Sequence, residues 1–364
     1  MKHVIKSWHI ALVLFLLAGL LHYTAVQHFQ HTHPTDSRVE TRATPTINLL
    51  LGGFRGVVTD WLWIRAMILQ EQGRFVEIVQ LAEWITALQP QFPEIWTLHA
   101  WNLAYNITVL LPDGAERYRW VRYAYEILRD QAIPATRYHP SICAELAWIL
   151  LHKIGGTTDD FADTFFLKWY ETYAPLLAPD GTLSQDAAQR EAFRKEAGIP
   201  ARWLETFEQQ YGRHDWRHPL THAAAWAYIG FIENPHQTNT IMAERFFLHA
   251  YRQLLFYGTI RKNEQEQEIH LEPDEGRIDA IVDIFAQAYQ RGRHPLIEEM
   301  YRVTMERCVQ LHIARNNPAK AKAMYLRLVE AFPHSRTAQQ GFEALAALPF
   351  HSEPRIIPIH GGTP

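Results

Sequence analysis

Apolar residues from Leu49 onward recur at the spacing of α-helices, and Gly and Pro separate the runs. Leu62, Ala66 and Leu69 share one helical face before Gly73 interrupts the pattern. A second stripe ends before Pro90 and consists of Phe75, Ile78, Val79, Ala82 and Ile85. This pattern predicts two antiparallel helices joined as a hairpin, and the same punctuation predicts an all-α body over residues 49–350.

The first hairpin is similar to a tetratricopeptide repeat placed over residues 59–92, in which small and apolar residues let two helices nest. Trp96 and Ala100 open the next unit in the same register. A second match lies near the C-terminus and has the helix-B spacing at Ala321, Tyr325, Leu328 and Pro333. Together they predict an α-solenoid of tetratricopeptide-like helical hairpins.

Three segments depart from this pattern. Residues of about 180–212 hold Gly and Pro stops around short polar helices, which indicates an insertion in the repeat body. Residues 261–275 are highly charged, and we expect any strand to be confined to this loop. Residues 351–364 are predicted to form a flexible tail that does not fold.

The N-terminal segment predicts a membrane anchor at residues 1–27. Lys2 and Lys6 precede an apolar run from Trp8 to Val26, which is about the length that crosses a bilayer. A cleaved signal peptide is the alternative, because the strictly apolar part covers Ile10–Leu21 alone. Either interpretation places the rest of the chain on the exported side, periplasmic or extracellular, after a polar tether at residues 28–48.

The composition excludes several classes of function. The net charge is −4 and no long basic run occurs, so nucleic acid is not an expected partner. Two cysteines, Cys143 and Cys308, are too few for a disulfide framework or a cysteine-based zinc site. Neither a Walker loop nor a G-x-G-x-x-G motif is present, so we expect no cofactor and find no evident small-molecule substrate.

Four runs of the chain resemble a family of bacterial membrane-anchored tetratricopeptide-repeat proteins. The longest is "LLGGFRGVVTDWLWIRAMILQEQGRFVEIVQLAEWITALQPQFPEIWTLHAWNLAYNITV", and the others are "ELAWILLHKIG", "YGRHDWRHPLTHAAAWAY" and "YRQLLFYG". The resemblance covers residues 49–258. It implies an N-terminal membrane helix, a helical-repeat body and no known reaction. In that family the position of His218 is usually apolar, so the resemblance implies no inherited three-histidine site.

His214, His218 and His222 lie four residues apart and raise the question of a zinc site. Pro219 fits the first turn of a helix and disfavours helical geometry at the residue before it. We therefore expect a helix to begin at about Pro219, which leaves His214 and His218 outside it. The three imidazoles then do not share one face. A polar contact of His222 within the helix packing is favoured over a metal site.

A partner-binding surface is predicted from the repeat register. The first helix of each hairpin lines the concave side of a solenoid, which places Trp63 and Met67 in one unit and Thr97 and Trp101 in the next. Asn102 and Asn106 follow at four-residue spacing. They either add polar contacts there or are buried amides that tie helices together, and the second interpretation is favoured.

These patterns together predict a membrane-tethered helical-repeat scaffold that binds a protein or peptide partner and does no catalysis. The alternative is a cell-envelope enzyme with a helical fold, assisted by a metal through the histidines.

Overall fold

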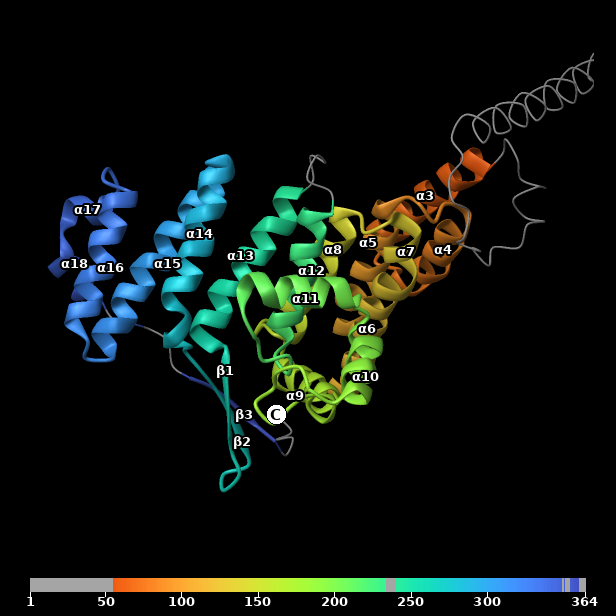
Figure 1. Ribbon diagram of the computed structural model, residues 1–364. Coiled ribbons are helices and arrows are strands. Elements are labelled where there is room, and N and C mark those ends of the chain that lie inside the picture. Colours follow the sequence, from red (N-terminus) through yellow and green to blue (C-terminus); the bar gives the residue numbers. More distant parts are fainter. Residues whose placement is uncertain (1–54, 234–239, 349, 351–353, 360–364) are drawn as a thin grey trace, which may run out of the picture. The chain divides into compact units, whose positions relative to one another are not determined.

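The computed structural model describes residues 55–233, 240–348, 350 and 354–359 (Figure 1). The described chain is mostly helical, which agrees with the predicted all-α class. It divides into two compact units, Met1–Asn102 and Leu103–Pro364.

The expected anchor at 1–27 and the polar tether at 28–48 lie outside the described residues. Among the helices that the structure does describe, none combines the length and the apolar character needed to cross a bilayer.

The described part of the first unit consists of three helices around one small core. Helix α3 spans Arg55–Glu71, α4 spans Phe75–Leu88 and α5 spans Pro93–Trp101. Gly73 has a φ of +68° between α3 and α4, a conformation that glycine adopts without strain. The core joins all three helices through Leu62, Ala66, Leu69, Ile78, Leu81, Ile85, Leu88 and Ile95. The two helices predicted on either side of Gly73 are therefore present and pack as a hairpin.

The chain continues from α5 into the second unit without a loop. The indole nitrogen of Trp96 donates a hydrogen bond to the carbonyl oxygen of Pro90 at 2.7 Å, which fixes the turn before α5. A π-helix, η2 (Asn102–Ile107), and a short 3₁₀-helix, η3 (Thr108–Leu110), follow α5 directly. Hydrogen bonds in a π-helix join residues five apart, so a four-residue spacing does not place two side chains as it does in an α-helix.

The helices of the second unit follow one another along the chain. The first half contains α6 (Gly114–Ile127), η4 (Leu128–Ala132), α7 (Ile133–Thr136), α8 (Pro140–Trp148), η5 (Ile149–Ile154), α9 (Ala162–Tyr173), η6 (Ala174–Leu176), α10 (Ala187–Ala197) and α11 (Ala201–Tyr211). The second half contains α12 (Pro219–Ile232), α13 (Thr240–Tyr257), η7 (Glu275–Arg277), α14 (Ile278–Gly292), α15 (Pro295–Ala314), α16 (Pro318–Ala331), α17 (Arg336–Gln340) and α18 (Phe342–Ala346).

Three of these helices, α8, α12 and α15, begin with the dipeptide His-Pro. The proline occupies the first helical position, where no backbone N–H is needed. The preceding histidine accepts a hydrogen bond through Nδ1 from the backbone N–H two residues later, at 3.2–3.3 Å. The start of α12 at Pro219 agrees with the prediction, and His218 is its N-cap.

Helix α12 lies at the centre of the second unit and packs against α8, α11 and α13 (Figure 1). Every residue from Pro219 to Gly230 is buried. Helix α8 passes very close to α12, and a small residue at the contact makes this possible. A Cβ atom on Gly230 would lie 2.8 Å from Cβ of Cys143. The indole nitrogen of Trp226 donates to the hydroxyl oxygen of Tyr125 at 2.9 Å, so the polar group of this buried tryptophan is satisfied.

The segment predicted as an insertion contributes to this core. It folds as α10 and α11, and its aromatic residues Phe193 and Phe207 are fully buried. Both rings contact the buried indole of Trp216, which lies between α11 and α12 in the sequence.

Helices α13 to α16 pack on their neighbours in the sequence, so this end of the second unit is a succession of stacked helices (Figure 1). The second predicted repeat falls on α15 and α16. Ala321, Tyr325 and Leu328 share the buried face of α16.

The prediction that residues 351–364 form an unfolded tail is wrong for residues 355–358. These residues form β3 (Arg355–Pro358), which pairs antiparallel with β2 (Glu268–Glu272), and β2 pairs with β1 (Thr259–Asn263). Ile357 is fully buried against Phe166, Leu167, Ile269 and Leu271. The physical reason is that alternate residues of β3 meet an apolar surface which β2 and α9 already present.

Candidate functional site

The predicted partner-binding residues on α3 and α5 lie at or near the surface of the first unit. The side chain of Met67 is 57% exposed and that of Trp101 is 41% exposed. Trp63 is half-buried and packs against the core of this unit. Thr97 is also half-buried, and its hydroxyl donates to the carbonyl oxygen of Glu94 at 3.0 Å.

The two asparagines differ from each other. Asn102 is buried, and its side-chain nitrogen donates to the carbonyl oxygen of Phe75 at 2.9 Å. This contact ties the end of α5 to the start of α4, which is the buried-amide role favoured from the sequence. Asn106 is half-buried and belongs to the second unit. Both residues lie on the π-helix η2, so the helical face expected from their four-residue spacing is not formed.

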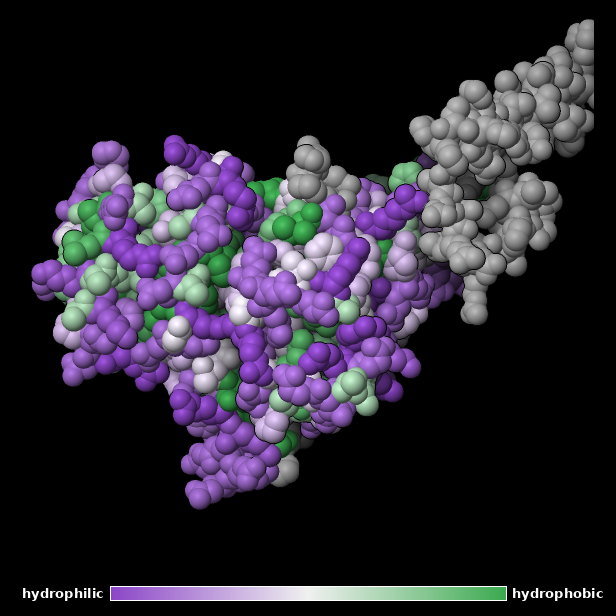
Figure 2. All heavy atoms as spheres, in the orientation of Figure 1, coloured by the Kyte–Doolittle hydropathy of each residue, from purple (hydrophilic) through white to green (hydrophobic). Residues whose placement is uncertain are grey.

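Exposed apolar side chains are concentrated in the first unit. Among the described residues, eighteen large apolar side chains are exposed, and half of them lie in the stretch 55–102. These nine are Val57, Trp61, Ile64, Met67, Ile68, Val76, Trp84, Phe92 and Trp101. The second unit presents a mainly hydrophilic face in which hydrophobic areas are small and separate (Figure 2). Concentrated apolar surface of this kind marks interaction sites in proteins.

Helix α3 is apolar on two opposite faces. Leu62, Ala66 and Leu69 form the buried face. Val57, Trp61, Ile64 and Ile68 follow a 4-3-4 spacing and form an exposed face, which we call the outer face of α3. This spacing is the one by which a helix packs against a further helix or another apolar surface.

The three histidines that suggested zinc are buried in the second unit, and each has its own hydrogen-bond partner. Nε2 of His214 lies 2.9 Å from the hydroxyl oxygen of Tyr251. Nε2 of His218 lies 3.1 Å from the carbonyl oxygen of Tyr257, while its Nδ1 caps α12. Nε2 of His222 lies 2.8 Å from the carbonyl oxygen of Trp216. The three rings therefore point to three different partners.

Burial lowers the pKa of His214, His218 and His222 to about 3 in each case, because the charged imidazolium would lose its hydration. All three are neutral at pH 7. His222 is surrounded by aromatic rings, with centroids 4.4–5.8 Å away, from Trp169, Tyr173, Phe193 and Trp216. His222 is therefore packed as part of the core of the second unit.

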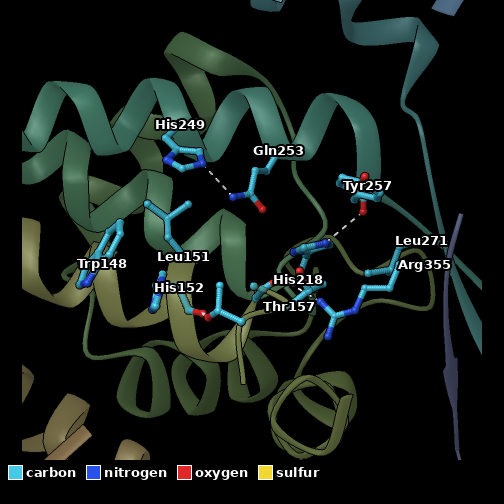
Figure 3. Close-up of a pocket in the computed structure, with 13 residues that line it drawn as sticks. Trp148, Leu151, His152, Thr157, His218, His249, Gln253, Tyr257, Leu271 and Arg355 are labelled. Carbon is cyan, nitrogen blue, oxygen red and sulfur yellow. Dashed lines mark hydrogen bonds between the residues drawn. The ribbon is translucent and has the colours of Figure 1, made fainter. Parts of the chain in front are cut away.

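A cavity of about 410 Å³ opens beside His218 in the second unit (Figure 3). Helix α8 and the π-helix η5 contribute Trp148, Leu151 and His152, and the loop 155–158 follows them. The opposite wall is α13, with His249, Gln253 and Tyr257. Two strands complete the lining through Leu271 of β2 and Arg355 of β3. We call this space the η5 cavity.

The polar groups of the η5 cavity are held in place by their neighbours. The guanidinium group of Arg355 donates to Oδ1 of Asp163 at 2.9 Å and to the carbonyl oxygen of Gly155 at 3.0 Å. The amide nitrogen of Gln253 lies 2.9 Å from Nε2 of His249 and donates to it. Burial, followed by the charges of nearby arginines, lowers the pKa of His249 to about 4, so this imidazole is neutral at pH 7.

Trp148 forms one end of the cavity and stacks on two other rings. Its ring stacks on His152 at a centroid distance of 4.6 Å and on Phe246 at 5.1 Å. These contacts hold the indole in place, and Trp148 offers an apolar wall at this end of the cavity.

Sequence reasoning identified His218 but missed His152, His249 and Arg355 as residues around one cavity. The four-residue spacing of His249 and Gln253 on α13 was an available signal. Arg355 had no local signal, since it lies in the segment expected not to fold.

One further group of side chains has the spacing of a metal site. Among the described residues, Glu266, Glu268 and His270 place ligand atoms within 4.8 Å of one another at the β1–β2 hairpin. Nε2 of His270 lies 3.1 Å from Oε2 of Glu268. Glu266 is exposed, and its Oε2 accepts a hydrogen bond from Asn263 at 2.6 Å.

Comparison of the chain with known protein families, with curated proteins and with solved structures finds no match to any of them.

Proposed function

We propose that this chain is a membrane-tethered scaffold of tetratricopeptide-like helical hairpins that holds a protein or peptide partner on its first unit and does no catalysis. The observation that supports this most directly is the concentration of exposed apolar side chains between residues 55 and 102. Surface of this kind is costly to leave in water, and contact with a partner removes that cost.

The outer face of α3 is the strongest part of this surface. The end hairpins of a helical array carry a polar outer face when they border water. Here Trp61 is 62% exposed and Ile64 is 59% exposed, so the first described hairpin presents an apolar surface typical of an interface. Tryptophan at the centre of an apolar patch is also the residue type that contributes most to binding energy at interfaces.

An extended peptide has a second place to lie on the same unit. In the proposed repeat array, α3 and α5 would be the first helices of two successive hairpins, and such helices line the concave side. Met67 and Trp101 are exposed at the positions predicted for this surface. Trp63 and Thr97, which are also predicted for this surface, are half-buried. Asn102 is buried and joins α5 to α4 through its hydrogen bond to the carbonyl oxygen of Phe75.

The tether and the side of the membrane are proposed from the sequence. Lys2 and Lys6 before the apolar run favour retention of the N-terminus inside and export of the body. A scaffold held in this way meets its partners near the membrane surface, at an effective concentration set by the polar tether at 28–48.

The test is capture of the partner from native membranes with matched variants. Ile64→Ser changes the outer face of α3, and Leu326→Ser changes α16 in the second unit. Both side chains are 59% exposed, so the two substitutions remove equal apolar surface. We expect Ile64→Ser to reduce recovery of the protein that co-purifies with the wild type at least fivefold, while Leu326→Ser leaves recovery unchanged. Equal recovery with both variants would show that the first unit does not carry the binding surface.

A further inference from the structure

We propose that the η5 cavity is a binding site for a small apolar molecule that carries one carboxylate group. The site belongs to the second unit alone and is independent of the partner surface proposed on α3 and α5. Its volume of about 410 Å³ lies within the range of small-molecule sites in proteins.

The charge of the lining favours one negative group. Among the described residues that line the cavity, Arg355 is the single permanently charged side chain, and none of them is acidic. The counter-charge of Arg355 comes from Asp163, which is not part of the lining and is 49% exposed. Water therefore screens Asp163 better than it screens Arg355, whose side chain is 11% exposed.

The guanidinium group of Arg355 keeps donors for a ligand. Arginine has five N–H donors. Three are used in the protein: Nε and Nη2 bond Asp163, and Nη1 bonds Gly155. One N–H remains on each terminal nitrogen, and such a pair can bridge the two oxygens of a carboxylate. In Figure 3 the guanidinium group reaches from β3 towards Thr157 and His218, at the floor of the cavity.

The rest of the lining indicates an apolar body with a single charge. Leu151, Leu271 and Tyr257 give carbon-rich walls, and Trp148 closes one end. His218 and His249 are neutral at pH 7, so they add no positive charge for a dianion such as phosphate. Gln253 and His249 form a polar spot on the wall opposite the loop 155–158, where a hydroxyl or amide of the ligand can bond (Figure 3).

The first experiment compares hexanoate with hexanamide, which have the same carbon chain and differ in charge. Titration calorimetry with the purified full chain measures both at pH 7, and inorganic phosphate is measured alongside. We expect hexanoate to bind at least tenfold more tightly than hexanamide and phosphate to give no heat of binding. Equal affinity for hexanoate and hexanamide, no binding of either, or tighter binding of phosphate would overturn the proposal.

The second experiment assigns the binding to the cavity through opposite effects of two substitutions. Arg355→Gln removes the charge and should weaken hexanoate binding at least tenfold. Asp163→Asn removes the counter-charge but keeps a hydrogen-bond acceptor, so binding should become at least twofold tighter. Lys262→Gln on β1 removes an exposed positive charge outside the cavity and should change nothing.

The far-ultraviolet spectrum and the melting temperature will show whether Arg355→Gln disturbs the pairing of β3. If it does, the Asp163→Asn variant still tests the proposal. Weaker or unchanged hexanoate binding in a folded Asp163→Asn protein would contradict a carboxylate at Arg355.

Discussion

The side-chain nitrogen of Asn102 donates a hydrogen bond to the carbonyl oxygen of Phe75, 27 positions earlier in the chain, at 2.9 Å. Asn102 is 1% exposed, so water cannot replace this bond when the amide is removed. We therefore expect Asn102→Ala to lower the free energy of unfolding by about 1–3 kcal/mol. Urea unfolding of the full chain measures this. Gln80→Ala, at an exposed position of α4, serves as the control and should stay within about 0.5 kcal/mol of wild type.

The close approach of α8 and α12 gives a second prediction. A methyl group at position 230 would lie 2.8 Å from Cβ of Cys143 and 3.1 Å from Cβ of Ala243, and both neighbours are held in the core. Gly230→Ala should therefore destabilise the protein by about 1–3 kcal/mol through overpacking. Gly292→Ala is the matched control, because nothing lies within 4 Å of the added methyl group at the end of α14. A helical alanine there should be neutral or slightly stabilising, so equal losses from both variants would argue against a tight contact at Gly230.

The docking of β3 can be tested with two adjacent isoleucines. Ile357 is fully buried, whereas Ile356 is 46% exposed on the other face of the strand. Ile357→Ser should lower the free energy of unfolding by about 2–4 kcal/mol, since it removes a core side chain and buries a hydroxyl. Ile356→Ser should have little effect. Thermal or urea unfolding distinguishes the two, and similar small effects would mean that β3 does not pack against α9 in solution.

Acid should weaken the second unit through its buried histidines. The pKa of His222 is about 3 in the folded protein, below its ordinary value of 6.5, because burial disfavours the charged ring. Unfolded chains therefore bind more protons, and the stability that the neutral ring contributes is present above pH 6.5 and is lost as the pH falls towards 3. His222→Gln keeps a donor for the carbonyl of Trp216 but does not titrate.

Urea unfolding at several pH values measures this effect. Between pH 6 and 4 the stability of His222→Gln should fall less steeply than that of wild type, by up to about 1.4 kcal/mol per pH unit. Comparison of the two proteins at pH 8 gives the cost of the substitution itself. Parallel curves for the two proteins would mean that His222 does not stay neutral in the folded state.

The proposed topology predicts the position of the C-terminus. A reporter that works only outside the cytoplasm, fused after Pro364, should be active, and a reporter that works only in the cytoplasm should be inactive. Fusions that lack residues 1–27 provide the control, because they should reverse both results. Activity of the cytoplasmic reporter with the full chain would contradict export.

Local patterns located much of the helical structure in advance. The stripes around Leu62 and Ile78 placed the first hairpin, because helical spacing and a glycine turn are encoded within a few residues. Pro219 likewise fixed the start of α12 through the geometry of a single ring. These features depend on neighbours along the chain, so sequence reasoning can reach them.

Features that depend on distant partners could not be reached in this way. Arg355 enters the η5 cavity because β3 pairs with β2, and those two strands are more than eighty residues apart. His152 lies on η5, which continues α8, and it shares that cavity with His249 because α8 packs on α13, a contact that neither helix signals by itself. Asn102 and Asn106 do not share the helical face that their spacing predicts. The prediction assumes the turn of an α-helix, whereas both residues lie on the π-helix η2.

The burial of α12 from Pro219 to Gly230 determines how the second unit can form. A helix buried on all sides over this length gains its stability from the helices around it, so we expect α12 to be unstable before they are in place. One of those neighbours, α13, follows it in the sequence. During synthesis, the chain up to Ile232 therefore holds an uncovered apolar segment until Thr240–Tyr257 has emerged. During this interval we expect the exposed apolar segment to make the nascent chain prone to aggregation.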